Sequence, residues 1–235
     1  MIDAMAPAVV DCRGVGRRYG RGRAAVSALC EIDCQVREGD RIAVTGRSGS
    51  GKSTLLHLMG GLDTPSTGTV SWPALGGSPD RPGAIGFVFQ APSLIPPLDA
   101  VENVALPLVI AGMTESEARA RAMDALSALG ITDLADRLPG ELSGGQAQRV
   151  AVARVLAARV RLVLADEPTA RLDPVHRDQV IETLLAISVH SGAAVVVSTH
   201  DTAVAARFER RWRLDDGRLI EDATTSPVRQ EDPAC

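Results

Sequence analysis

The segment 46–54, GRSGSGKST, limits the possible folds of this chain more than any other stretch. It matches the pattern G-x-x-x-x-G-K-[ST], in which glycines let backbone N–H groups converge on phosphate oxygens. The apolar run RIAVT before it is typical of a strand, and KSTLLHLMGG after it is typical of a helix ending at a glycine pair. A strand, a glycine loop and a helix in this order predict an α/β fold with a nucleoside triphosphate site.

Two side chains of this loop have predicted roles in that site. Lys52 is expected to reach the β- and γ-phosphates, and the Ser53 hydroxyl is expected to bind Mg²⁺. A glycine-rich turn without a ligand is the alternative, which the flanking strand and helix make the weaker interpretation.

Two adjacent acids follow a second apolar run. VRLVLAD, residues 160–166, is typical of a strand buried on both faces, and it ends at Asp166. An acid at the end of a strand beside the loop is the expected second metal ligand, and Glu167 is placed to polarise a water aimed at the γ-phosphate. The two acids could instead only cap the next turn.

His200 ends a third apolar run, AAVVVSTH. In a parallel sheet the carboxyl ends of the strands line the ligand crevice. His200 is therefore expected beside Asp166 and Lys52, although a lone histidine is more often structural.

The region 91–158 has a different pattern, with proline-punctuated apolar segments and predicted helices. Thr114 and Glu117 form a capping box ahead of a helix that Gly130 closes. We expect this region to form a separate helical lobe between two α/β parts, 1–90 and 159–222. The polar residues 223–235 are expected to be a disordered tail.

Further local signals lie in the last α/β part. Asp173 and Pro174 are typical of the N-cap and first residue of a helix. Asp216 and Gly217 are typical of a hairpin turn.

Composition and cysteine spacing exclude several classes of function. The net charge of −4 and the 3% of aromatic residues argue against nucleic-acid binding. No apolar run reaches the roughly 18–20 residues that span a bilayer, and the start lacks a signal-peptide pattern, so a cytoplasmic protein is expected. Cys30 and Cys34 could share a metal, but two buried free thiols on one face of a strand are the preferred interpretation.

The segment 141–149, ELSGGQAQR, is a second candidate anion site without titratable groups suited to catalysis. It opens a predicted helix, whose free amides and positive end attract anions. Its presence raises the question why one chain would need two such sites.

Taken together, these motifs resemble the ATP-binding subunits of ABC transporters over residues 8–221. GRSGSGKST, FVFQ, LSGGQ, LADEP and STH occur in the order found in that family, and LSGGQ is its distinguishing motif. The resemblance implies an ABC ATPase fold, with a mainly parallel core sheet, an N-terminal antiparallel β subdomain and an α-helical lobe.

The resemblance also implies a role for each matching residue. Glu167 would be the general base, His200 would contact the γ-phosphate, and Gln90 would sense Mg²⁺ and the attacking water. Tyr19 would stack on adenine, although it could simply pack in a strand. Asp173 would lie at the contact between two subunits. The ATP-binding residues of the chain itself would be Tyr19, Gly46, Arg47, Ser48, Gly49, Ser50, Gly51, Lys52, Ser53 and Thr54, with Ser53, Gln90 and Asp166 on the metal.

The second anion site would then act on another molecule. In the family, two ATPase subunits pair head to tail, so the signature segment of one chain closes on the ATP held by the other. The implied residues are Leu142, Ser143, Gly144, Gly145 and Gln146. Arg171 departs from the small or amide residue common in the family, which puts the details of dimer coupling in doubt.

The stretches GGLDTPSTGTV and FVFQAPSLIPPLDAVENVALPL resemble the branch that serves lipoprotein release and macrolide or peptide export. Integral membrane permease subunits are the implied partners, and they would hold the cytoplasmic chain against the inner face of the membrane. The sequence leaves open a homodimer or heterodimer, and import or export.

Three other functions are weaker interpretations. A soluble ABC-type ATPase acting on nucleic acid or ribosomes usually carries long inserts or two tandem cassettes. A P-loop kinase would not explain LSGGQ, and the presence of Lys52, Glu167 and His200 argues against a silent binding module.

Overall fold

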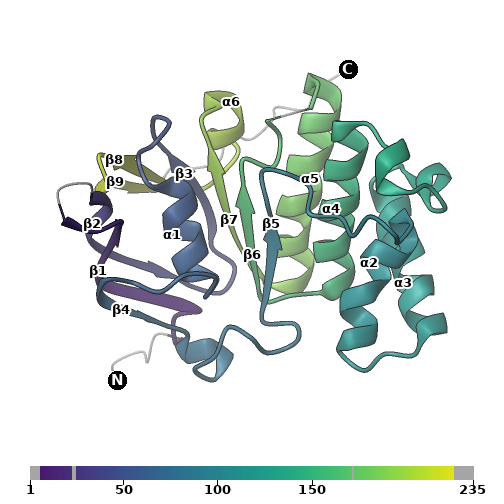
Figure 1. Ribbon diagram of the computed structural model, residues 1–235, viewed down its shortest axis with the longest axis horizontal. Coiled ribbons are helices and arrows are strands. Elements are labelled where there is room, and N and C mark those ends of the chain that lie inside the picture. Colours follow the sequence, from purple (N-terminus) through teal and green to yellow (C-terminus); the bar gives the residue numbers. More distant parts are fainter. Residues whose placement is uncertain (1–5, 23–24, 171, 225–235) are drawn as a thin grey trace, which may run out of the picture.

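In the computed structural model, which describes residues 6–22, 25–170 and 172–224, the strands form two sheets (Figure 1). The strands are β1 Val10–Tyr19, β2 Val26–Val36, β3 Arg41–Thr45, β4 Thr67–Ser71, β5 Ile85–Val88, β6 Leu162–Asp166, β7 Ala194–Thr199, β8 Arg210–Asp215 and β9 Arg218–Thr224. The helices are α1 Lys52–Met59, α2 Ala100–Ile110, α3 Glu115–Ala128, α4 Gly144–Ala158, α5 Pro174–Ser191 and α6 Thr202–Ala205, with 3₁₀ turns at Pro73–Leu75, Thr132–Leu134 and Pro139–Glu141. Within the described ranges no helix is long and apolar enough to cross a membrane.

The larger sheet has the order β5-β6-β7-β3-β8-β9 and is parallel except for β9. The smaller sheet, β2-β1-β4, is antiparallel. The expected combination of a mainly parallel core sheet and an N-terminal antiparallel sheet is therefore confirmed.

The core sheet separates two apolar clusters, because alternate side chains of a strand point to opposite faces. On β7, Val196 packs on the side of α1 and the antiparallel sheet, whereas Val195 and Val197 pack on the side of α4 and α5. Every residue of β6 and β7 is buried, which explains why these segments are apolar runs without alternation.

The register of the parallel strands brings their polar ends together. Asp166 of β6 pairs with Ser198 of β7, and Thr45 of β3 pairs with Thr199. The loop after β3 and the residues after β6 and β7 consequently share one edge of the sheet.

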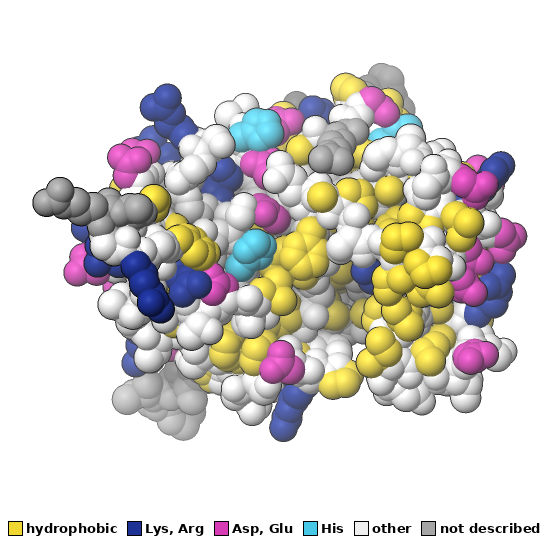
Figure 2. Space-filling view, in the orientation of Figure 1, with side chains coloured by type: hydrophobic (Ala, Val, Ile, Leu, Met, Phe, Trp, Pro, Cys, Tyr) yellow, Lys and Arg dark blue, Asp and Glu magenta, His cyan; other side chains and the backbone are white. Residues whose placement is uncertain are grey.

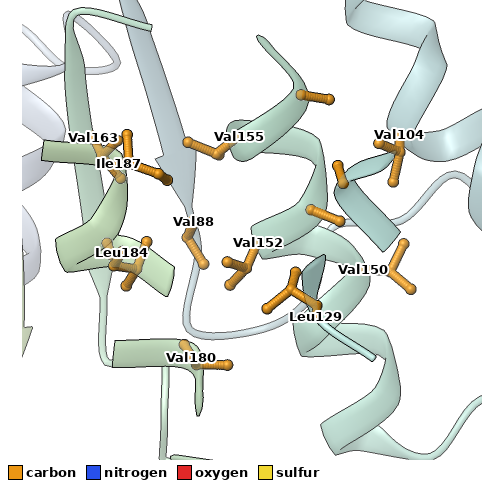
Figure 3. Close-up of a cluster of buried hydrophobic side chains, with 14 of the residues drawn as sticks. Val88, Val104, Leu129, Val150, Val152, Val155, Val163, Val180, Leu184 and Ile187 are labelled. Carbon is orange, nitrogen blue, oxygen red and sulfur yellow. The ribbon is translucent and has the colours of Figure 1, made fainter. Parts of the chain in front are cut away.

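The helices α2, α3 and α4 form the helical lobe, and the capping box at Thr114 and Glu117 is confirmed. The lobe does not enclose a separate core. Val150, which faces the lobe, and Val152 and Val155 of α4 all lie in the same apolar cluster as Val88 of β5 (Figure 3). Helix α4 is thus packed against the core sheet as well as against its own lobe.

The expectation that Cys30 and Cys34 share a face of β2 is wrong. Glu31 has a φ of 51°, and β2 uses one residue more than β1 between the pairs Val15–Ile32 and Arg17–Leu29. This β-bulge reverses the alternation, so Cys34 is buried opposite Cys12 while Cys30 is half-buried on the other side. The hydrogen bond with Cys12, together with burial, raises the pKa of the Cys34 thiol well above its usual value.

The boundary of the expected tail is also corrected. Ala223 and Thr224 belong to β9, where they pair with Arg211 and Arg210. The hairpin at Asp216 and Gly217 that joins β8 to β9 is confirmed. The rest of the expected tail, 225–235, lies outside the described residues.

We predict that Leu164→Ala lowers the free energy of unfolding by about 2–5 kcal/mol, because it leaves a cavity beneath α1. Leu164 has no solvent-exposed surface, whereas 56% of the surface of Leu62 is exposed. Leu62→Ala is therefore the matched control and should change stability by less than about 0.5 kcal/mol. Urea denaturation followed by circular dichroism measures both values, and equal losses would contradict the assignment of Leu164 to the core.

Candidate functional site

The loop between β3 and α1 requires glycine where it approaches other backbone closely. Gly46 and Gly51 have φ values of 152° and 101°, in the region that favours glycine. A Cβ atom on Gly46 would lie 2.3 Å from the Leu214 carbonyl oxygen, and one on Gly51 would lie 2.5 Å from that of Ala28. The loop therefore lies close between β8 and the antiparallel sheet, where a side chain at either position would collide.

Helix α1 begins at this loop without a side-chain cap. Its N-cap residue is Gly51, and no side chain of the described residues bonds to its first turn. The amides of Lys52, Ser53 and Thr54 therefore have no partner within the helix and lie at its positive end. The helices α2 to α5 differ, because each begins with a side-chain cap, from Asp99, Thr114, Ser143 and Asp173 in turn.

The Lys52 side chain folds back over the loop. Its Nζ atom donates hydrogen bonds to the carbonyl oxygens of Gly46 at 2.9 Å and Arg47 at 3.2 Å. The same atom lies 3.9 Å from Glu167 Oε1. A buried ammonium group is thus held against the loop that precedes the free amides, which suits an anionic ligand.

Glu167 is held in an unfavourable backbone conformation beside Lys52. Its φ of 46° is in the left-handed region that non-glycine residues rarely adopt. Its N–H group donates to the backbone oxygen of Ser198 at 3.1 Å and to the hydroxyl oxygen of Ser198 at 2.9 Å. Those bonds fix the turn that aims the Glu167 carboxylate into the site.

His200 contacts the same carboxylate from the end of β7. Its Nδ1 atom lies 2.8 Å from Glu167 Oε2, within hydrogen-bond distance. The His200 side chain is 70% exposed, whereas the Glu167 side chain is 12% exposed. His200 therefore orients the buried acid while its ring remains open to a ligand.

Asp166 is buried at the end of β6 and accepts a hydrogen bond from the Ser198 hydroxyl. A carboxylate offers about four acceptor positions, so this bond leaves capacity for a metal. The side chains of Asp166, Ser53 and Gln90 carry oxygens, which are the hard donors that Mg²⁺ prefers. Sequence reasoning did not single out Ser198, although a polar residue near the end of an apolar run was a signal.

A cavity of about 550 Å³ joins most of these groups. Its lining residues are Ala28, Ser48, Gly49, Gly51, Lys52, Ser53, Thr54, Gln90, Glu167 and His200. Of the residues predicted to bind ATP or the metal within one chain, those that do not line it are Tyr19, Gly46, Arg47, Ser50 and Asp166. Gly46, Arg47 and Ser50 instead shape the loop, and Ala28 is a lining residue that no sequence motif indicated.

Tyr19 lies at the end of β1 with 41% of its surface exposed, so it is not a core side chain. Its hydroxyl donates to Asp63 Oδ2 at 2.8 Å, and the Arg17 guanidinium lies 4.7 Å from the ring centroid. Burial opposes ionisation of Asp63, but hydrogen bonds from Tyr19 and the Thr64 amide, with the charge of Arg17, lower its pKa. One face of the ring is thus covered by Arg17.

The signature segment 142–146 opens α4 away from this cavity, and none of its residues lines the cavity. The Ser143 hydroxyl accepts from the Gln146 N–H group at 3.2 Å, and the Gln146 side-chain oxygen accepts from the Ser143 N–H group at 2.8 Å. Ser143 and Gly144 are exposed. The segment therefore presents a hydroxyl group and free amides to the outside.

Asp173 is the N-cap of α5, as predicted, and it is exposed. It accepts hydrogen bonds from the amides of Val175 at 3.0 Å and His176 at 3.2 Å. The hydrogen bond from the His176 side chain is the main cause of its lowered pKa. Arg171, which departs from the family pattern, lies outside the described residues.

We predict that Gly51→Ala weakens ATP binding by about 10-fold or more, because the added Cβ displaces the loop from Ala28. Gly140→Ala is the control, since a Cβ there meets no atom within 4 Å and the φ of Gly140 is not positive. Titration with a fluorescent ATP analogue measures both affinities. Equal affinities would show that the close approach of the loop to Ala28 is not required.

Comparison with known proteins identifies the family. The family model described as "ABC transporter" matches residues 29–170. The lipoprotein-releasing system ATP-binding protein LolD of Chromohalobacter salexigens is 44% identical, over 92% of this chain and 94% of that protein. The macrolide export ATP-binding/permease protein MacB of Nitrosomonas europaea is 41% identical over 99% of this chain but 37% of that protein.

Solved structures agree with this result. The dimeric structure of the bacterial ABC transporter cassette MJ0796 has a TM-score of 0.87 and 36% identity, over 92% of this chain and 99% of that chain. A post-hydrolysis structure of the same cassette, bound to ADP and Pi, has a TM-score of 0.86 and 37% identity. The chain belongs to the ABC transporter family and is one of its ATP-binding cassettes, the ATPase subunits of these transporters.

Proposed function

We propose that two copies of this cassette close around two ATP molecules, each held by the loop of one copy and the signature segment of the other. The observation that carries this proposal is the separation of the two anion sites. The segment 142–146, in which Ser143 and Gly144 are exposed, does not line the cavity that contains Lys52. The relative MJ0796 has been solved as a dimer, which supports the same arrangement here.

The residues of one chain would bind ATP and prepare a water for attack. Lys52 and the free amides of α1 would neutralise the phosphates, and Ser53, Gln90 and Asp166 would hold Mg²⁺, which spreads the charge of the transferred group. Glu167 would accept the proton of the water, because its carboxylate lies in the cavity beside Lys52. His200 would orient Glu167 and contact the γ-phosphate.

The partner chain would complete the site with groups that do not titrate. The Ser143 hydroxyl keeps its own hydrogen available, since in the capping box it acts as an acceptor. The amides of Gly144 and Gly145 lie at the positive end of α4. Leu142 and Gln146 would hold this segment in place, and the exposed Asp173 would lie at the subunit contact. Catalysis would rest on positioning and electrostatic stabilisation.

A membrane permease would dock in an apolar groove between the core sheet and α2. This groove of about 460 Å³ includes Leu62, Phe87, Leu106, Ile110 and Val155 among its lining residues. Figure 2 shows hydrophobic side chains on both sides of a hollow in this face. A short amphipathic helix of the permease fits such a groove, and Leu62 and Ile110 are 56% and 75% exposed.

The work done would be lipoprotein release, export or related mechanical work through that permease. The 44% identity to the LolD protein of a lipoprotein-releasing system, over 94% of that protein, supports this kind of work. The cassette would then lie in the cytoplasm, on the inner face of the membrane. Docking of the permease in the groove would hold the cassette at the membrane, because the permease would carry the membrane-spanning part.

We predict that Glu167→Gln lowers ATP hydrolysis by at least about 100-fold, since the amide cannot accept the proton. The variant should still bind ATP, because Lys52 and the amides of α1 are unchanged. ATP should therefore trap a dimer, which light scattering coupled to size-exclusion chromatography detects.

Glu182→Gln is the control, because Glu182 is an exposed acid of α5 outside the cavity. That variant should hydrolyse ATP normally and should not accumulate a dimer. A Glu167→Gln protein that stays monomeric at saturating ATP would contradict the shared site.

A further inference from the structure

A buried side chain of α4 contacts the loop that carries Gln90. Gln148, five residues after Ser143, is 2% exposed, and its Nε2 atom donates to the carbonyl oxygen of Phe89 at 3.1 Å. A helix rises about 1.5 Å per residue, so this bond lies roughly 7–8 Å along the helix from the start of the signature segment. The first part of α4 is thus connected directly to the residue before Gln90.

A second side chain of α4 holds the same loop on the other side of Gln90. The Arg154 Nη2 atom donates to the carbonyl oxygen of Ser93 at 3.0 Å. Gln148 and Arg154 therefore bond to the backbone one residue before and three residues after Gln90.

The loop is also fixed to the core, through the side chain of Phe89. The rings of Phe89 and Phe87 stack with centroids 4.4 Å apart, and the His57 ring of α1 lies 6.3 Å from Phe89. Val88 packs with Val152 of α4 (Figure 3). Backbone bonds to α4 and ring contacts to α1 therefore meet at the residue next to Gln90.

The side chains of Gln148 and Arg154 do not provide the most stable packing for these positions, because each leaves a buried polar atom without a partner in the described structure. The Gln148 Oε1 atom is buried with no hydrogen-bond partner in the described structure, and the same holds for Arg154 Nε. Burial lowers the pKa of Arg154. Unsatisfied buried polar atoms cost free energy, and an apolar side chain of similar size would avoid that cost. Their presence points to a role in orienting the loop.

We propose that Gln148 and Arg154 are positioning residues for Gln90, through which α4 transmits contact with the partner's nucleotide to the ATP of its own chain. The inference rests on the proposed shared site. When a phosphate bound by the partner pulls on Ser143, the shift of α4 moves the carbonyl groups of Phe89 and Ser93 and with them Gln90. The two ATP molecules of a dimer then act cooperatively.

The test is Gln148→Leu, which removes the bond to Phe89 and keeps a buried side chain of similar size. We expect kcat to fall about 10-fold while KM for ATP and the ATP affinity change less than about twofold. The Hill coefficient for ATP hydrolysis should fall toward 1, a change that a purely structural role would not produce. Arg154→Met should change kcat and the Hill coefficient in the same direction.

Gln35→Leu is the matched control, because the Gln35 amide bonds to Asp11 and Arg37 in the antiparallel sheet, away from α4. Its kcat and Hill coefficient should equal those of the unchanged protein. Equal values for Gln148→Leu and Arg154→Met, with folding confirmed by circular dichroism, would overturn the inference.

A second measurement separates this inference from the proposed function. Glu167→Gln alone reports whether ATP joins two chains. If that variant forms the ATP-dependent dimer and Gln148→Leu keeps the kcat and Hill coefficient of the unchanged protein, only the positioning role fails. If Glu167→Gln stays monomeric, the shared site itself fails.

Discussion

The ATP site of this cassette depends on where the positive N-terminal ends of the helices α1 and α4 lie. Helix α1 begins at Gly51 without a side-chain cap, at a loop that requires glycine at positions 46 and 51, so its free amides are available to an anion. Helix α4 begins at Ser143 with its hydroxyl and amides exposed. The two starts belong to one chain but not to one cavity. In the proposed dimer, a single molecule would therefore hold halves of two different sites.

The parallel sheet places the reactive side chains around the first of these ends. The register sets the ends of β3, β6 and β7 side by side, and Ser198 bonds to both Asp166 and Glu167 across that edge. The left-handed turn at Glu167 then aims its carboxylate at Lys52. The second end is joined to the same edge through Gln148 and the loop that carries Gln90, so the fold connects the sites mechanically.

Features set by local chemistry could be predicted from the sequence, whereas features set by pairing could not. The glycine loop, the cap at Asp173 and the hairpin at Asp216 each follow from a few adjacent residues. The bulge at Glu31 could not be predicted, because it arises from the register between β1 and β2. Ala28 lines the cavity only because the two sheets are in contact, which the sequence does not indicate. The hydrogen bond from Gln148 to Phe89 likewise depends on the packing of α4 against β5.

Hydrogen exchange of the signature segment tests the central claim most directly, because it reports on the amides that the partner's ATP would contact. In a Glu167→Gln protein, ATP should slow exchange at residues 143–147 only at protein concentrations where the dimer forms. The amides after Gly51 should be protected by ATP at every concentration, since they bind it within one chain. Protection of 143–147 that does not depend on protein concentration would place the signature on its own chain's ATP and contradict the account.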